Sequence, residues 1–101
     1  MSVDSFLGEP FNIASTSLLL HIVSKLTNKI PGKVVLTFGD CHIYSNHLDQ
    51  VKRQLKRFPY SFPNINIPDF KSIKDVENSK YEDYIISNYN HHKGIKAEMV
   101  A

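Results

Sequence analysis

The chain has 101 residues, 42% of them hydrophobic, and a formal net charge of +2. That length allows one modest hydrophobic core, and so small a charge does not indicate DNA as a partner. No apolar run is long enough to span a membrane, and the N-terminus lacks a basic region followed by an apolar stretch. The single cysteine, Cys41, fits a reducing compartment. We therefore expect a cytoplasmic protein without membrane contact.

The first predicted element is a long apolar helix that begins near Pro10 and breaks at Asn28. Its hydrophobic residues recur at helical spacing: Ile13, Ala14, Leu18, Leu19, Leu20, Ile22, Val23 and Leu26. The segment Ile30-Pro31-Gly32 then predicts a turn. This helix is more apolar than a surface helix needs to be, which indicates burial on most sides or against another chain.

A strand is predicted from Lys33 to Phe38, continuing past Gly39-Asp40 into Cys41 to Tyr44, because the run is rich in β-branched and aromatic residues. Ser45 or Asn46 can cap a second helix with Asp49 in its first turn. Its apolar face carries Leu48, Val51 and Leu55, and its other face carries the basic patch Lys52, Arg53, Lys56 and Arg57. Such a patch can bind an anion. The simpler interpretation is that these positive charges interact favourably with the C-terminal end of the helix dipole and with water.

The rest of the chain predicts little regular structure. After a proline-punctuated loop we expect a short strand at Ile65–Ile67, a weak surface helix from Lys71 to Asp83, a strand from Tyr84 to Ser87, and a tail from residue 88 onward. The fold class is therefore α/β (α+β), with a mixed sheet of three strands packed against the long apolar helix. So few strands look incomplete as a free-standing domain, which indicates that part of the structure is missing.

The densest group of polar side chains is the run Gly39-Asp40-Cys41-His42-Ile43-Tyr44-Ser45-Asn46-His47. His42 and Tyr44 are two residues apart, so in an extended chain they point the same way, with Ile43 turned into the core. The pair suits recognition of a polar ligand, or it is a satisfied polar pair at the end of a strand.

Three segments together resemble the thymidylate synthase family. Residues 2–8 with residues 10–15 resemble its nucleotide-binding turn and following helix, residues 39–47 resemble its ribose-binding strand end, and residues 89–97 resemble its C-terminal segment. Order and intervening lengths also fit, so the resemblance covers essentially the whole chain. It implies that residues 1–101 are a single C-terminal portion of a thymidylate synthase domain.

The resemblance implies a homodimeric enzyme that reductively methylates dUMP to dTMP, with methylene-tetrahydrofolate as co-substrate and no metal. It assigns the phosphate to Ser2, the base to Asn12, the ribose hydroxyl to His42 and Tyr44, and the folate side to Asp4 and to Val100 in the closing tail. Val3 and Ile43 complete the expected dUMP-binding residues, to which Asp4 also belongs.

Asn12 favours uracil on chemical grounds. An amide offers an N–H donor to the uracil carbonyl and a carbonyl acceptor to the ring N–H, whereas cytosine presents the reverse pattern. A site built to pair polar groups rejects analogues that leave them unpaired by about 10⁴-fold. The alternative is a helix-capping asparagine, since Asn12 lies near the helix start.

The reaction also needs a cysteine thiolate, which the resemblance places upstream of Met1. Cys41 lies inside the ribose motif and is interpreted as a core thiol. Met1 stands where the family has a phosphate-binding arginine, so we expect this chain alone to be inactive until the N-terminal half is supplied in cis or in trans. The alternative function is a non-catalytic remnant or a dimerising nucleotide-binding module.

Four histidines raise the question of a metal: His42, His47, His91 and His92. No set among them has the ligand count and spacing of a zinc site, and His91 and His92 are expected to be solvated.

Overall fold

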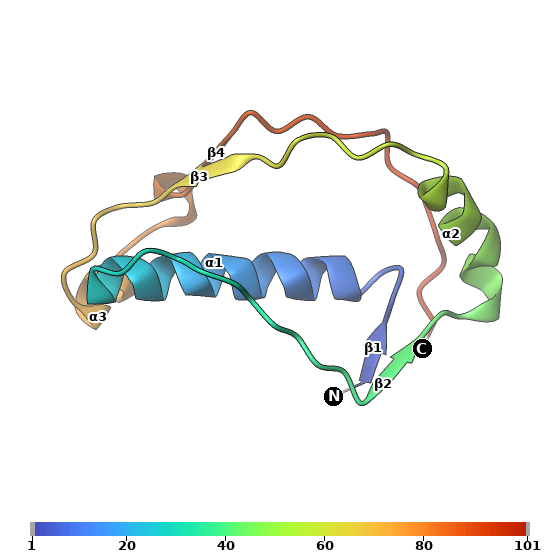
Figure 1. The fold of residues 1–101 in the computed structure, drawn as a ribbon, viewed down its shortest axis with the longest axis horizontal. Helices are drawn as coiled ribbons and strands as arrows, with labels where there is room; N and C mark the ends of the chain where they lie inside the picture. The colour runs from blue at the N-terminus through green and yellow to red at the C-terminus, as the bar shows by residue number, and fades with distance from the viewer. Residues whose placement is uncertain (1, 101) are drawn as a thin grey trace. The chain divides into compact units, whose positions relative to one another are not determined.

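A computed structural model describes residues 2–100. In chain order, the elements are β1 (Ser2–Asp4), α1 (Glu9–Thr27), β2 (Asp40–His42), the 3-10 turn η1 (Ser45–His47), α2 (Leu48–Leu55), β3 (Asn64–Asn66), α3 (Ile73–Glu77), the 3-10 turn η2 (Tyr81–Asp83) and β4 (Ile85–Ser87) (Figure 1). The described residues form two compact units. Unit 1 comprises residues 2–14, 35–60 and 91–100, and unit 2 comprises residues 15–34 and 61–90.

Unit 1 is built on a parallel pair of short strands. Strand β1 pairs with β2 in the register Ser2 to Asp40, Val3 to Cys41 and Asp4 to His42. The pairing is extended by one further bond, from the Ser5 N–H to the His42 carbonyl, at 2.8 Å. A parallel pair needs a long crossover, and the segment that contains α1 supplies it. The pair therefore brings Asp4 and His42 to the same end of the two strands.

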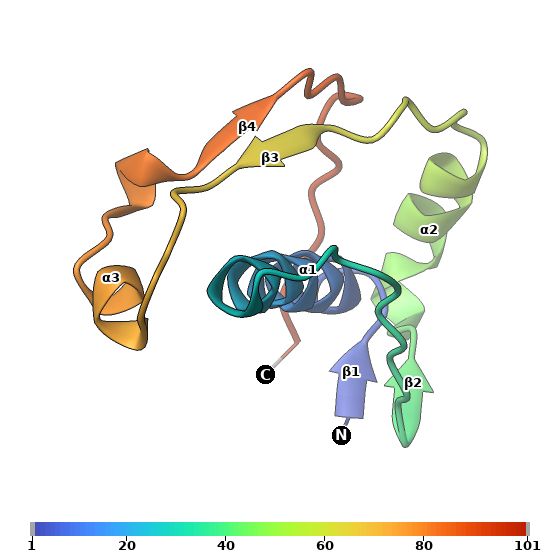
Figure 2. The same ribbon diagram turned by 60° about the vertical axis from the view of Figure 1, so that its left-hand side comes forward.

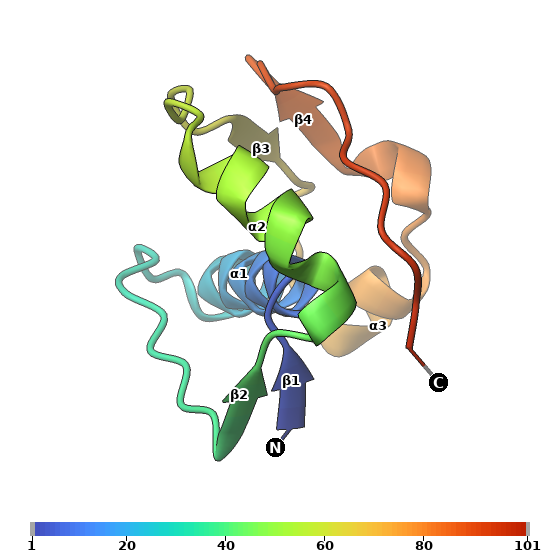
Figure 3. The same cartoon turned by 90° about the vertical axis from the view of Figure 1, so that its right-hand side faces the viewer.

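The C-terminal tail lies along α2 and η1 within unit 1 (Figure 3). Three side chains bond to three main-chain carbonyls of the tail: Arg57 Nη1 to Lys93 at 2.8 Å, Gln50 Nε2 to Lys96 at 3.4 Å, and His47 Nε2 to Glu98 at 2.6 Å. His47 lies in η1, Gln50 lies in α2, and Arg57 lies two residues beyond the end of α2, so the tail is bonded along the whole of this segment. The tail is thus held through three of its backbone carbonyls, and also through the His92 side chain, whose Nε2 is 2.7 Å from the Phe58 carbonyl oxygen.

Unit 2 contains an antiparallel pair of strands, in which β3 lies beside β4 and Ile65 is opposite Ile86 (Figure 2). Phe70 is its buried apolar residue and contacts the ring of Tyr84, with 6.3 Å between centroids. Helix α3 begins with a capping box, in which Ser72 and Asp75 satisfy each other's backbone N–H groups.

The long helix is confirmed. Asn28 has a φ of 53° and therefore ends α1 in the left-handed region, and the Lys29 N–H returns to the Ser24 carbonyl at 2.9 Å. This is the usual way for a helix to satisfy its last carbonyls. Among residues 2–100, no helix has the length and apolar character required to cross a membrane.

Several predicted elements are wrong or displaced. Residues 33–38 form no strand, and Val35 is 84% exposed, because no segment within residues 2–100 pairs with them. The single three-stranded sheet is replaced by two separate pairs of strands. Strand β3 lies one residue earlier than expected, and the predicted helix from Lys71 to Asp83 is reduced to α3 and η2.

The predicted cap of the second helix is also wrong. The chain passes through η1 before α2 begins, so Ser45 and Asn46 lie inside that turn, and neither η1 nor α2 has a side-chain cap. Asp49 does lie in the first turn of α2, as expected.

The chain buries little apolar surface. Among the described residues, Val3 and Phe70 are the buried hydrophobic side chains, whereas Ile30 and Phe62 are each 94% exposed. The accessible surface is 8467 Å², against about 5,800 Å² expected for a self-contained domain of this mass. The sequence expectation of an incomplete core is consistent with this excess.

Candidate functional site

The Asp4 turn joins β1 to α1 and forms one side of the candidate site. Asp4 Oδ1 accepts hydrogen bonds from the N–H groups of Phe6 at 3.0 Å and Leu7 at 3.4 Å, and the Asp4 carbonyl accepts one from Gly8 at 2.9 Å. An aspartate side chain that bonds to the backbone just ahead of it holds a tight turn. A Cβ atom on Gly8 would meet the Asp4 carbonyl oxygen at 3.0 Å, a tight contact, so this turn favours glycine for close approach.

The two residues before Asp4 have different surroundings. The exposed Ser2 hydroxyl donates a hydrogen bond to Asp40 Oδ2 at 3.2 Å. Val3 is 3% exposed, so its side chain belongs to the core and only its main chain can face a ligand. The expected phosphate contact of Ser2 is sterically open and stays a prediction.

His42 and Tyr44 lie together, as their spacing predicts. Their rings meet edge to face with centroids 4.9 Å apart, and His42 Nδ1 is 3.4 Å from Asp40 Oδ1. The expectation that Ile43 turns into the core is wrong, because that side chain is 46% exposed, and its expected contact with dUMP stays a prediction. Strand β2 ends at His42, so the alternation of a strand no longer applies one residue later.

The most buried side chain is one that the sequence did not single out for this site. His47 is fully buried, between the rings of Phe6 and Tyr44 at centroid distances of 5.7 and 5.6 Å. Its Nε2 is 2.6 Å from the Glu98 carbonyl oxygen, and its Nδ1 is 3.9 Å from Asp4 Oδ1 without a hydrogen-bond partner. The signal in the sequence was its place at the end of the polar run, three residues after Tyr44.

Asn12 and Val100 complete the set of predicted residues. Helix α1 begins at Glu9, and the Asn12 N–H donates to the Gly8 carbonyl at 3.1 Å. Asn12 therefore lies inside the first turn, and its alternative role as the helix cap is wrong. Val100 is 38% exposed and follows the tail residue bonded to His47 by two positions.

Cys41 is exposed, so its interpretation as a core thiol is wrong. Its neighbours are polar: the Ser5 hydroxyl oxygen is 2.9 Å from Sγ, and Glu9 Oε2 is 3.8 Å from it. Within residues 2–100, no three His, Cys, Asp or Glu side chains are arranged to hold a metal ion. His92 is not simply solvated, because its Nε2 bonds to the Phe58 carbonyl at 2.7 Å.

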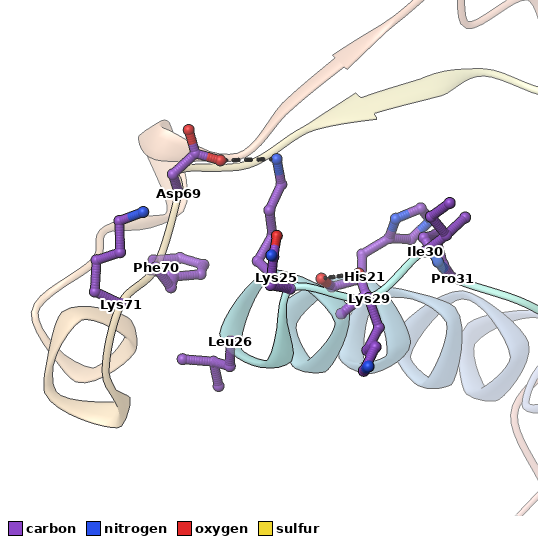
Figure 4. A pocket seen from close by; sticks show the side chains of 11 residues that line it. His21, Lys25, Leu26, Lys29, Ile30, Pro31, Asp69, Phe70 and Lys71 are labelled. Carbon is purple, nitrogen blue, oxygen red and sulfur yellow. Dashed lines mark hydrogen bonds and ion pairs between the residues drawn. The ribbon is translucent and has the colours of Figure 1, made fainter.

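A separate hollow of about 530 Å³ lies in unit 2, at the end of α1 (Figure 4). Lys25 and Asp69 point toward each other there, with Nζ and Oδ1 2.9 Å apart. The hydrogen bond from Lys25 and its positive charge lower the pKa of the Asp69 carboxyl below 3.8. The buried polar atoms without a partner in the described chain are on His47 and Gln50, in unit 1. The polar groups of this hollow thus do not form a built ligand site.

The basic patch on α2 has a partly structural explanation. Arg57 donates to a tail carbonyl, and Lys52 and Arg53 are exposed in the last turn of α2. This arrangement favours the simpler interpretation of the patch over an anion site.

Comparisons with known proteins agree with one another. A sequence model of the family described as thymidylate synthase matches residues 1–101. A thymidylate synthase of Francisella tularensis subsp. holarctica is 47% identical over 98 residues, which are 97% of this chain and 35% of that relative. A thymidylate synthase of Francisella philomiragia is 44% identical over the same length.

A solved structure shows the same likeness. Thermostable thymidylate synthase A from Bacillus subtilis superimposes with a TM-score of 0.88 at 29% identity, covering 97% of this chain and 34% of that one. The α/β fold class expected from the sequence is thereby confirmed as a partial version of that fold. The chain spans about a third of the length of the relatives that it matches.

Proposed function

Because the chain belongs to the thymidylate synthase family, we propose that it is the C-terminal portion of such an enzyme. In this role it contributes dUMP and folate contacts to the reductive methylation of dUMP to dTMP. The observation that carries the proposal is the parallel pairing of β1 with β2, which brings Asp4 opposite His42, with Tyr44 against the His42 ring. Two segments far apart in sequence thus present a carboxylate, an imidazole and a phenol at one end of two strands.

The ribose contact is proposed for His42 and Tyr44. An imidazole and a phenol can each donate and accept, which suits a sugar hydroxyl that does both. Asp40, 3.4 Å from His42 Nδ1, orients that ring and favours a hydrogen on Nδ1. Nε2 of His42 is then the atom available as an acceptor. The Ser2 hydroxyl, beside the same strands, is proposed as a phosphate ligand.

The base contact is proposed for Asn12. Asn12 lies inside the first turn of α1, not at the N-cap position that its place in the sequence also suggested. The amide pairs with the carbonyl and ring N–H of uracil and mismatches cytosine. The base preference of the assembled enzyme is then set by this one side chain.

The folate contacts are proposed for Asp4 and for the tail around Val100, with methylene-tetrahydrofolate as the co-substrate and no metal. Three main-chain carbonyls of the tail bond to side chains of η1, of α2 and of Arg57 beyond α2, and Val100 lies two residues past the last of these carbonyls. A segment so close to a bonded residue needs only a short movement to close over a ligand.

The rest of the site is proposed to come from the other two-thirds of the family domain, in cis or in trans, and from a second subunit of a homodimer in the cytoplasm. The exposed apolar residues of this chain are the surface that such a segment would cover. The one thiol, Cys41, contacts Ser5 and lies in the proposed ribose strand rather than at a base. The chain without a nucleophilic thiol from elsewhere is therefore expected to be inactive.

A chimaera tests the proposal. It joins the part of the Francisella tularensis relative outside the matched 98 residues to this chain, and is called the chimaera below. We expect dTMP formation that requires both dUMP and methylene-tetrahydrofolate, and none from this chain alone. A folded chimaera that binds neither compound would contradict the proposal. Binding of dUMP without turnover would favour the non-catalytic nucleotide-binding module.

A further inference from the structure

His47 contacts both the tail and the Asp4 turn. It is the one fully buried large side chain of the described residues, and it is polar. A buried polar group is normally paired on every atom that can bond, because an unpaired one costs about 1–3 kcal/mol. One ring nitrogen of His47 is paired and the other is not.

The paired nitrogen fixes the direction of its bond. A main-chain carbonyl can only accept, so Nε2 carries the hydrogen and donates to Glu98 across 2.6 Å. The unpaired Nδ1 faces Asp4 Oδ1 at 3.9 Å. An approach of about 1 Å would bring these two atoms to ordinary hydrogen-bond length, and a proton taken up from solvent would then lie between Nδ1 as donor and Asp4 Oδ1 as acceptor.

Asp4 is already fixed on its other side. The same Oδ1 that faces His47 accepts the Phe6 and Leu7 N–H groups, so the carboxylate cannot turn without opening its own turn. The ring of Phe6 also packs on His47. His47 is thus in contact with the carboxylate, with the turn that holds it, and with the tail two residues before Val100.

We propose that His47 is a positioning residue that ties the C-terminal tail to the Asp4 turn, so that tail closure and the placement of the Asp4 carboxylate are coupled. The inference deepens the proposed function, since the tail and Asp4 are both assigned to the folate side. His47 itself touches neither substrate, and it acts through its two neighbours. Nε2 holds the tail, and Nδ1 adjusts the carboxylate.

Two substitutions separate these two contacts. In His47→Gln the amide reaches as far as Nε2 and keeps a donor for Glu98, but it leaves nothing polar at Nδ1. In His47→Asn the amide lies where Nδ1 was and keeps a donor for Asp4, but it no longer reaches the tail. The matched control is His92→Gln, because His92 also bonds through Nε2 to a carbonyl, while its ring contacts Tyr60 rather than a carboxylate.

The first measurement is the rate at which carboxypeptidase removes tail residues from the chimaera, without any ligand. Losing a buried hydrogen bond raises the equilibrium constant for detachment of the tail about tenfold. We therefore expect carboxypeptidase to trim the tail of His47→Asn about tenfold faster than that of the unsubstituted chimaera. His47→Gln and His92→Gln should stay near the unsubstituted rate. Equal rates for His47→Asn and the unsubstituted chimaera, or equally fast trimming of both His47 variants, would overturn the inference.

The second measurement is steady-state kinetics on the same proteins. We expect His47→Asn to raise the KM for methylene-tetrahydrofolate about tenfold, and His47→Gln to lower kcat by a similar factor with little change in that KM. A merely structural role would raise this KM and lower kcat together in both variants, which would overturn the coupling.

The two measurements also separate this inference from the proposed function. Carboxypeptidase trimming requires no substrate, so it tests the tail contact even if the chimaera is inactive, a result that would count against the proposed function. If His47→Asn does not fold, as judged by its circular dichroism, His47→Gln decides alone: a protected tail with unchanged kcat would contradict the coupling.

Discussion

Each unit of the chain contains one pair of strands, but the two units differ in the contacts that join their remaining segments. Unit 1 joins three distant segments through side chains that bond to backbone, and its most buried residue is the histidine at their meeting point. Unit 2 joins two segments through strand pairing, the apolar contact of Phe70 with Tyr84, and an exposed ion pair. The polar groups of unit 1 thus lie around the proposed site, whereas the contacts described for unit 2 serve its stability.

The largest effect is expected in unit 1 from Asn12→Asp. A carboxyl group reverses the hydrogen-bond pattern presented to the base, so the chimaera should lose its preference for dUMP over dCMP by about 10⁴-fold. The measurement is kcat/KM for each nucleotide. An unchanged preference for dUMP over dCMP would contradict the proposal that Asn12 contacts the base.

The next effect concerns stability and compares one glycine from each unit. Gly8→Ala places a Cβ atom 3.0 Å from the Asp4 carbonyl oxygen, whereas nothing lies within 4 Å of a Cβ atom on Gly32. We expect Gly8→Ala to destabilise the chimaera by about 1–3 kcal/mol. Gly32→Ala should change stability by less than about 1 kcal/mol, in the stabilising direction. Denaturant unfolding measures both, and a similar loss from both variants would show that the Asp4 turn is not tightly packed.

A smaller pair of changes removes one tyrosine hydroxyl from each unit. Tyr44→Phe should raise the KM for dUMP about tenfold, because a hydrogen bond to the ribose is lost. Tyr84 is the control, since its hydroxyl is 2.8 Å from the Ser79 hydroxyl in unit 2. Tyr84→Phe should cost about 1 kcal/mol of stability and leave the KM unchanged. If Tyr44→Phe and Tyr84→Phe raise the KM for dUMP by the same factor, the proposed ribose contact of Tyr44 is contradicted.

The smallest effect belongs to the exposed ion pair of unit 2. Lys25 lowers the pKa of Asp69 below 3.8 in the folded chain. The ion pair therefore stabilises the fold above pH 3.8, and this stabilisation is lost as the pH falls through the lowered pKa of Asp69. Asp69→Asn should therefore melt slightly below the unsubstituted chimaera at about pH 6, and the gap should close in acid and in high salt. A gap that grows in acid would contradict this assignment.

The sequence predicts the local elements of this fold well. Helix α1 has nineteen residues and its own signals at both ends, so its bounds depend little on the rest of the chain. The contact between His42 and Tyr44 could also be predicted from local sequence, because residues two apart in an extended segment point to the same side of the chain. Local residue composition also predicts strands β3 and β4, with bounds that differ from the structure by about one residue.

Several of the failures depend on partners far away in sequence. Residues 33–38 have strand composition, but a strand forms only where another pairs with it, and none within residues 2–100 does. The burial of His47 depends on Glu98, fifty-one residues later. Cys41 is exposed because polar groups of the Asp4 turn and α1 lie beside it, which no pattern within its own strand indicates.

We expect this chain to supply the nucleotide contacts of a larger family domain. This can be measured by equilibrium dialysis of labelled dUMP against three samples: this chain alone, the remaining part of the Francisella tularensis relative alone, and a mixture of the two. We expect saturable binding by the mixture, weakened by Tyr44→Phe, and none by either part alone. Binding by this chain alone that is as tight as binding by the mixture, or no binding by a mixture that forms a stable folded complex, would contradict it.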